Sequence, residues 1–141
     1  MLRRPILLSL LLVPVLTRPS LAAQTGLDSP EVALKTYIEG LRRGDLSTVR
    51  RAYNLAVAGS DFHLPAPLPI DSYRVTKRLV LDSAAVRRST ETGVVPPARV
   101  GDVELQVEEV IQGQREMFSY WLRLFDGQWR IYAHAAWGGP D

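Results

Sequence analysis

Apolar residues at helical spacing predict a helix near the start of the chain. Four of them, spaced i, i+3, i+4 and i+7, are Leu34, Tyr37, Ile38 and Leu41. Such spacing places side chains on one face of a helix. Ser29 is a typical residue before the first turn, Pro30 fits the first helical position, and Gly44 suits a left-handed end. We therefore predict an amphipathic helix over 30–43.

A second helix is predicted over 46–57. Asp45 can cap its first turn, and Gly59 follows its expected end. Residues 60–69 then carry proline at three alternate positions, which removes backbone donors and favours an extended, irregular run. We expect this segment to be a loop that leads to the sheet.

The second half of the chain alternates between apolar and polar residues, as half-buried strands do. The alternation covers 73–81, where Lys77 interrupts the apolar face, and 103–111. Glu109 falls at an apolar position of the second segment, and a buried carboxylate is costly unless it is paired. We therefore expect a β-bulge that turns Val110 inward and Glu109 to solvent.

A hairpin is expected near the end of the chain. Residues 117–125 and 129–137 are predicted as strands, and Asp126-Gly127 between them tolerates the positive φ angles of a tight turn. Gly113-Gln114 fits another tight turn. Residues 83–100 stay ambiguous, because part of the segment fits a helical turn or a short strand equally well.

Capped helices followed by an antiparallel meander predict an α+β domain, with N-terminal helices packed on a curved antiparallel sheet of about four strands. The two ends of the domain resemble the NTF2-like (cystatin-like α+β) superfamily. At the front, the resemblance rests on Ser29-Pro30-Glu31, Tyr37-Ile38 and Leu41–Asp45. At the back, it rests on the hairpin Leu122–Ile131. We therefore assign residues 29–141 to one NTF2-like domain.

The resemblance implies a cone, in which a strongly curved sheet packs on the helices and leaves a pocket at its wide end. Members of the family include isomerases, dehydratases and epoxide hydrolases. Others are non-catalytic domains that bind ligands or proteins, and many members dimerise through the sheet. Because one fold serves all these functions, the function must be argued from the site.

Residues 1–22 are predicted to be a secretory signal peptide. Arg3 and Arg4 precede an apolar run of about 12 residues, which is shorter than the roughly 20 residues of a membrane span. Ser20-Leu21-Ala22 fits a small-residue cleavage site, and 23–28 a short tether. We expect export to the periplasm or the medium, with no membrane attachment after cleavage.

The charge balance and the absence of cysteine exclude several functions. Of the 17 Lys and Arg, three lie in the signal, so the exported part has 14 of them against 15 Asp and Glu. A net charge near −1 gives no basis for nucleic-acid binding, which needs a cationic surplus. Without cysteine, the chain has no disulfide, no thiolate metal site and no lipid attachment site of a lipoprotein.

Few side chains are candidates for catalysis. His134 and Tyr132 share one phase of the last strand, and Asp61 precedes a second histidine, His63, in the proline-rich loop. If the tryptophans of the last strand face the core, His134 lies on the outer face of the sheet. If the sheet curls the other way, His134 and Tyr132 point into the pocket as acid, base or hydrogen-bond donor.

The candidate residues form two groups. The catalytic candidates are Asp61, Glu109, Tyr132 and His134. The candidates for ligand binding are the aromatic residues Tyr37, Tyr53, Tyr120 and Trp121. The sequence has no histidine pair at metal-binding spacing and no phosphate-binding loop, so we expect neither a metal nor a cofactor.

These observations favour an exported, non-catalytic domain that binds a small apolar ligand or a partner protein. The alternative is a cofactor-free enzyme of the isomerase, dehydratase or hydrolase type that acts in the cone pocket. Its side chains would come from Tyr37, Asp61, Glu109, Tyr132 and His134. Two or more of them meeting in a cavity would favour the enzyme, whereas aromatic rings filling the cavity would exclude it. A homodimer formed through the sheet is a third possibility.

Overall fold

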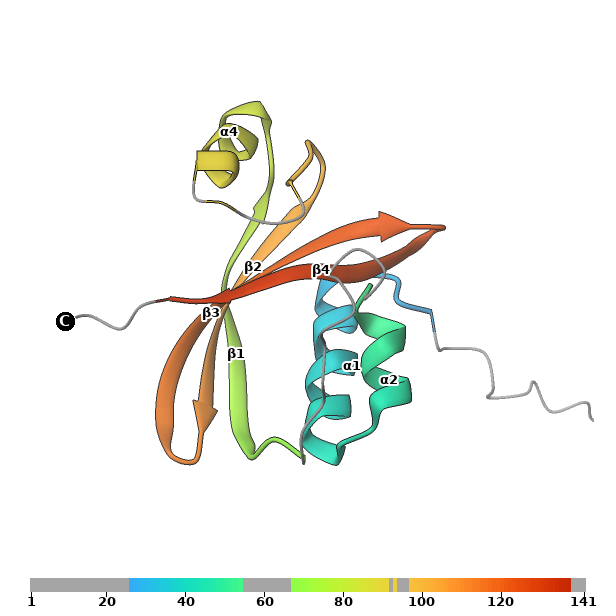
Figure 1. Ribbon diagram of the computed structural model, residues 1–141, viewed down its shortest axis with the longest axis vertical. Coiled ribbons are helices and arrows are strands. Elements are labelled where there is room, and N and C mark those ends of the chain that lie inside the picture. The colour runs from blue at the N-terminus through green and yellow to red at the C-terminus, as the bar shows by residue number, and fades with distance from the viewer. Residues whose placement is uncertain (1–25, 55–66, 92, 94–96, 138–141) are drawn as a thin grey trace, which may run out of the picture.

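The protein is an α+β domain with helices packed on a curved antiparallel sheet, as predicted (Figure 1). The computed structural model describes residues 26–54, 67–91, 93 and 97–137. The elements are α1 (Pro30–Arg43), α2 (Leu46–Ala52), β1 (Ile70–Val80), α4 (Ser83–Glu91), β2 (Val103–Ile111), β3 (Gln114–Phe125) and β4 (Gln128–Ala136). The strands lie in the order β1-β2-β3-β4, and each pair is antiparallel. The predicted signal peptide and the candidate Asp61 lie outside the described residues.

Local sequence signals set the ends of α1. The Ser29 hydroxyl accepts a hydrogen bond from the backbone N–H of Val32 at 3.1 Å, and Gly44 ends the helix with a φ of 65°. Leu27 does not belong to a tether, since it is only 1% exposed in the core and its carbonyl accepts a hydrogen bond from the Trp129 N–H at 2.9 Å. The domain therefore begins before the first helix.

The helix α2 is shorter than predicted. Asp45 caps it as expected and accepts a hydrogen bond from the Thr48 N–H at 3.1 Å, but the helix ends at Ala52 rather than at 57. Tyr53 is extended and forms a parallel bridge with Ile131. The chain leaves the helix early because its backbone pairs with the edge of β4, a long-range contact that helical periodicity does not report.

A β-bulge in β1 reverses which face of the sheet every second side chain of the strand occupies. The register between β1 and β2 shifts between Val75 and Lys77. Before the shift, Tyr73 and Val75 pack against the core under α1, whereas Leu79 packs on the other face. The bulge explains why Lys77 interrupts the apolar alternation in the sequence.

A further bulge, in β4, separates two residues that the sequence places on one face. Trp121 pairs with Ala133, but the next residue of β3, Leu122, pairs with Ile131, so Tyr132 is extra. His134 therefore shares a face with Ile131, and Tyr132 packs on the opposite face. The prediction that Tyr132 and His134 point the same way is wrong.

The bulge predicted at Glu109 does not exist. The register between β2 and β3 runs without a shift from Val103 to Ile111, so Glu109 faces the core and is 2% exposed. The Tyr120 hydroxyl donates a hydrogen bond to its carboxylate. That partner, supplied by the next strand, offsets part of the cost of burial that had favoured a bulge.

Two tight turns and one helix complete the sheet. Asp126 and Gly127 have positive φ angles as predicted, and Gln112 with Gly113 forms the other turn, one residue earlier than expected. The ambiguous segment after β1 is the helix α4. It begins after Asp82, whose side chain accepts a hydrogen bond from the Ala85 N–H at 2.8 Å.

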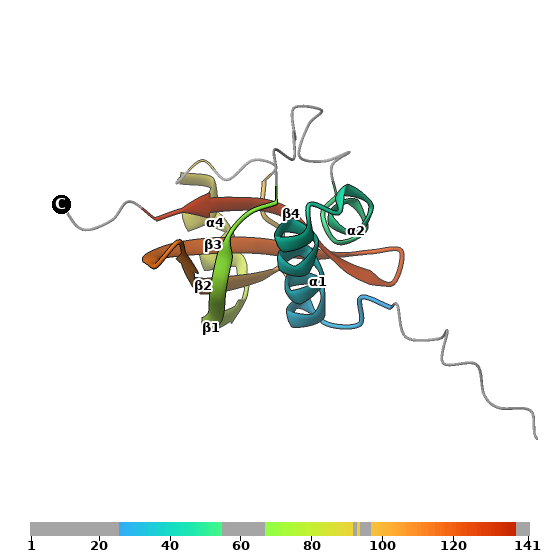
Figure 2. The ribbon, with the colours of Figure 1, turned by 90° about the horizontal axis from the view of Figure 1, so that it is seen from below.

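The sheet carries a hydrophobic core on each face. The larger core lies between the sheet and α1 with α2, and the smaller one lies beneath α4, so the helices sit on opposite sides (Figure 2). The buried members of the smaller core are Leu81, Ala98, Trp121, Tyr132 and Ala133. None of the helices in the described ranges is long and apolar enough to cross a membrane.

Candidate functional site

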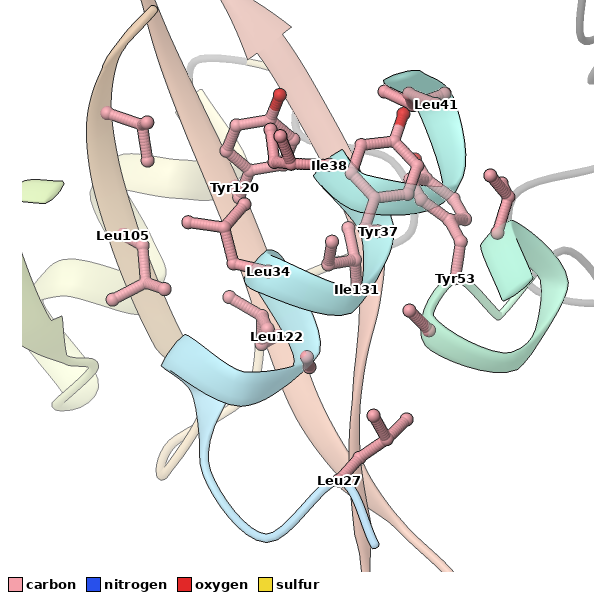
Figure 3. Packing of buried hydrophobic residues seen from close by; sticks show 14 of the residues in the cluster. Leu27, Leu34, Tyr37, Ile38, Leu41, Tyr53, Leu105, Tyr120, Leu122 and Ile131 are labelled. Carbon is pink, nitrogen blue, oxygen red and sulfur yellow. The ribbon is translucent and has the colours of Figure 1, made fainter. Parts of the chain in front are cut away.

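Five of the predicted candidates meet on the helix-facing side of the sheet. This tyrosine cluster consists of Tyr37, Tyr53, Glu109, Tyr120 and His134. They come from α1, the end of α2, β2, β3 and β4. Figure 3 shows the rings of Tyr37, Tyr53 and Tyr120 gathered at one end of the large core. The structure thus brings together residues up to about a hundred positions apart.

Hydrogen bonds and ring contacts connect the cluster. The Tyr120 hydroxyl donates to Glu109 Oε1 at 2.5 Å, and the Tyr120 ring stacks on His134 with 5.7 Å between ring centroids. The Tyr53 hydroxyl lies 3.0 Å from His134 Nδ1. Tyr37 contacts Tyr53 and Tyr120 at centroid distances of 5.4 and 5.9 Å. These contacts fix each ring from at least two sides.

Burial shifts the titration of the whole cluster. It raises the pKa of Glu109 above 4.5, an effect that the Tyr120 hydrogen bond partly reverses, and nearby Glu116 adds to it. Burial also raises the pKa of Tyr53 to about 12 and those of Tyr37 and Tyr120 above their usual range. The tyrosines are therefore neutral donors at physiological pH.

His134 lies at the outer end of the cluster. Part of the residue is exposed, yet the packed ring loses enough hydration to lower its pKa below 6.5. The neutral imidazole is thus favoured, and its Nδ1 can accept the proton of the Tyr53 hydroxyl.

The inner part of the cluster is closed to solvent. Glu109 and Tyr120 are each 2% exposed, and Tyr37 is 3% exposed. A substrate could reach the carboxylate only after the rings moved apart. Three enzyme candidates do meet here, namely Tyr37, Glu109 and His134, but aromatic rings cover the carboxylate.

Replacing Glu109 by glutamine should change how stability depends on pH. Burial raises the pKa of Glu109 in the folded protein. The protonated carboxyl therefore contributes its full stability to the wild type below about pH 4.5, and this contribution is lost as pH rises through the folded-state pKa. Glutamine does not titrate and still accepts from Tyr120. The unfolding free energy of the variant minus that of the wild type should therefore rise with pH, by about 1.4 kcal/mol for each unit separating the two pKa values.

Urea unfolding at a series of pH values from 4 to 8 measures this difference. His134 is present in both proteins, so its titration cancels. Glu108→Gln is the matched control, since Glu108 lies on the opposite face and pairs with exposed Arg74. A difference that stays constant with pH would show that Glu109 ionises in the folded protein as it does in the unfolded chain.

The other face of the sheet is hollowed by an open pocket of about 810 Å³. Two rows of paired residues cross its floor. One row is Leu79, Glu104, Trp121 and Ala133, and the other is Lys77, Gln106, Ser119 and Ala135. Ala85, Arg88 and Ser89 of α4 form a wall, and Trp137 borders the end of β4. We call this the sheet-face pocket.

A chain of hydrogen bonds runs along the floor of the sheet-face pocket. The Trp137 indole N–H donates to Ser119 Oγ at 2.9 Å, and the Ser119 hydroxyl donates to Glu104 Oε1 at 2.8 Å. The Gln106 amide donates to the same oxygen at 3.3 Å. Glu104 is thereby held in place on its strand, while its second oxygen takes part in neither bond.

The structure separates the sequence candidates. Trp121 lies in the sheet-face pocket, whereas Tyr37, Tyr53 and Tyr120 lie on the other face. Tyr132 is completely buried and donates a hydrogen bond to Asp102, so it is a core residue. The sequence analysis grouped the tyrosines with Trp121, because the sequence alone does not show which of these side chains share a face of the sheet.

The polar residues of the sheet-face pocket were missed. Glu104 and Gln106 alternate with apolar residues, which indicates only a solvent-facing side of a strand. Their significance depends on Ser119 and Trp137, which the register of β3 and β4 places beside them. No local signal reports that register.

No group of three or more His, Asp or Glu that could hold a metal ion occurs in the part of the chain that the structure describes. Comparisons with protein-family models, with curated proteins and with solved structures found no match to this chain. The function is therefore inferred from the geometry of the two faces of the sheet.

Proposed function

We propose that this chain is an exported, non-catalytic domain of the NTF2-like type that binds a small amphipathic molecule in the sheet-face pocket. The observation that carries the proposal is the pocket itself. Its volume of about 810 Å³ lies within the range of roughly 300–1,000 Å³ that is usual for small-molecule sites. The proposal of export rests on the signal-like residues 1–22, and the proposal of the NTF2-like family rests on the two ends of the domain that resemble it.

The lining of the pocket fits a ligand with an apolar body. Ala133 and Ala135 leave space between Trp121 and Trp137, and Leu79 continues the apolar surface. A few polar groups on the same floor, chiefly Glu104, supply orientation. This mixture of aromatic and aliphatic surface with few fixed polar groups is typical of ligand pockets.

A small molecule fits this site better than a partner protein does. Residues of α4 form one wall of the pocket beside the sheet, so the surface is concave. Stable protein interfaces cover about 800 Å² on each partner and are usually broader than such a hollow. A second copy of the chain at this face is the competing occupant that a mass measurement would reveal.

One observation favours a cofactor-free enzyme as the second candidate. Glu109, whose pKa burial raises, lies among neutral tyrosines and next to His134, which resembles the environment of a general base. This function requires a substrate to displace the covering rings. A ligand there would perturb Tyr37 and Tyr120, whereas a ligand in the sheet-face pocket would perturb Trp121 and Trp137.

Filling the pocket should abolish ligand binding. We expect the protein purified from the exported fraction of its host to carry an extra mass in native mass spectrometry. Ala135→Phe should remove that mass, because the new ring occupies the floor between the tryptophans. Ala136→Phe is the matched control, since Ala136 is the exposed neighbour on the other face.

Two results would contradict the proposal. One is an adduct that survives Ala135→Phe. The other is a bare chain whose Trp121 and Trp137 indole NMR signals do not move with any member of a small-molecule fragment library. A dimer mass that disappears with Ala135→Phe would instead assign this face to a second copy. Movement of the Tyr37 and Tyr120 signals alone would favour the enzyme.

A further inference from the structure

The charged residues that line the sheet-face pocket are left without ion pairs. They are two cations and two anions, namely Lys77, Asp82, Arg88 and Glu104. None of the four forms an ion pair with any residue in the described ranges. Neighbouring cations of β1 behave differently, since Arg74 pairs with Glu108 and Arg78 pairs with Glu31.

The strand register fixes how Lys77 and Glu104 are placed. Lys77 is opposite Gln106 and Leu79 is opposite Glu104, so Lys77 and Glu104 are diagonal neighbours on the pocket face. Such diagonal pairs are typically about 7–8 Å apart. Opposite charges at this spacing, with an open pocket above them, leave room for a ligand group between them.

Glu104 is arranged to accept a donor from a ligand. It lies in the middle of the floor and is half-buried, and both of its hydrogen bonds within the described residues use Oε1. The remaining oxygen, Oε2, is available to a ligand cation or N–H group. The Trp121 and Trp137 rings that border the pocket add aromatic surface, which attracts organic ammonium groups.

The arrangement of charges disfavours three simpler ligand classes. A pure cation would meet Lys77 and Arg88 at the β1 and α4 side, and a pure anion would meet Glu104 on the floor and Asp82 at the start of α4. A neutral apolar molecule would remove water from Glu104 without replacing it. A ligand that carries both charges satisfies both signs.

We infer that the ligand of the sheet-face pocket is a small zwitterion with an apolar body. Its ammonium group binds Glu104 Oε2, its anionic group faces Lys77 and Arg88, and its body lies against Trp121 and Trp137. The inference rests on the proposed function, because it names the chemical class of the ligand for that same pocket.

Two matched probe sets test the charge requirement on the full exported chain. The aromatic set is phenylalanine, phenethylamine and hydrocinnamate, and the aliphatic set is leucine, isoamylamine and isocaproate. Within each set only one charge is removed at a time. Dissociation constants come from titrations that follow the Trp121 and Trp137 indole NMR signals. We expect a zwitterion to bind at least tenfold more tightly than either singly charged analogue in at least one set.

Variants assign each charge to its partner. Glu104→Gln should weaken the zwitterion and the amine at least tenfold and leave the carboxylate unchanged. Lys77→Met should weaken the zwitterion and the carboxylate but not the amine. Glu108→Gln is the control, because it removes a carboxylate from the same strand and face outside the pocket. It should change none of the dissociation constants.

The outcomes separate this inference from the proposed function. An amine or a carboxylate that matches the zwitterion in both sets would overturn the ligand class, as would equal effects of Glu104→Gln and Glu108→Gln. If no probe binds, but the natural adduct is still lost with Ala135→Phe, the assignment of a zwitterionic ligand is overturned and the proposed binding pocket stands. If no probe binds and the adduct test also fails, both the zwitterionic ligand and the proposed function are overturned.

Discussion

Replacing Asp102 by alanine should destabilise the protein by about 3–5 kcal/mol, the usual cost of removing one partner of a buried ion pair. Asp102 is 3% exposed. Its carboxylate accepts hydrogen bonds from Arg123 Nε and Nη2 at 2.9 and 2.8 Å, from the Tyr132 hydroxyl at 2.7 Å and from the Arg99 N–H at 2.8 Å. Alanine would leave the Arg99 N–H and the Tyr132 hydroxyl without this acceptor and the Arg123 charge without its counterion, although Arg123 Nη2 keeps its hydrogen bond to the Pro97 carbonyl at 3.0 Å.

Equilibrium unfolding in urea at pH 7 measures the loss. Asp102→Asn is the informative second variant, since it keeps the shape but removes the charge, and its cost should fall between the wild type and alanine. Glu108→Ala is the control, because Glu108 pairs with the exposed Arg74 and such pairs contribute at most about 1 kcal/mol. If Asp102→Ala cost no more than this control, the Asp102 network would not hold the fold.

The Asp102 network also supports the sheet-face pocket. The Asp102 carbonyl accepts a hydrogen bond from the Leu81 N–H at 2.8 Å, and Tyr132 packs in the same core as Trp121. Two residues of this core, Leu81 and Ala133, also line the pocket. A network that fixes one side of the sheet thereby preorganises the proposed binding surface.

Replacing Gly40 by leucine should cost about 3 kcal/mol, at the upper end of the range for overpacking. A Cβ atom at Gly40 would lie 2.8 Å from Val49 Cγ2 and 3.0 Å from the Val49 backbone nitrogen. The second contact involves backbone, so α1 and α2 must separate to relieve it. That movement would also loosen Tyr37 and Tyr53, which these helices hold in the tyrosine cluster.

A double-mutant cycle identifies the cause. Gly40→Ala gains helix propensity of about 1 kcal/mol, which offsets part of its clash. Val49→Ala removes Cγ2, so the two substitutions together should be less costly than the sum of their separate effects. Lys35→Leu, on the exposed side of α1, is the control and should change stability by about 0.5 kcal/mol or less. Strict additivity would contradict the close approach of the helices.

The two faces of the sheet suggest different roles. The helix-facing side holds titratable groups, but rings enclose them, and their main expected effect is on how stability depends on pH. The opposite side holds a hollow lined by charges of both signs that form no ion pair within the described part of the chain. An open pocket lined by charged groups is the better candidate for binding, because a ligand can reach it without rearranging the core.

Features that depend on a few adjacent residues were readable from the sequence. Ser29 and Gly44 delimit α1 because capping and left-handed turns are decided within a few residues. Asp126-Gly127 likewise specifies its hairpin turn. The alternating strands and the order of elements followed from periodicity, and together they predicted the α+β class.

Only the tertiary structure decided which residues share a face and a site. Glu109 was expected in solvent, but Tyr120 of the next strand pairs with it in the core. Bulges in β1 and β4 reassigned Leu79 and Tyr132 to the face beneath α4. Strand register, bulges and buried partners depend on pairing between distant segments, and the periodicity of one segment contains no record of its partner. The sequence by itself therefore determined most of the elements and the α+β class, whereas the end of α2, the helix α4 and the pocket depended on the tertiary structure.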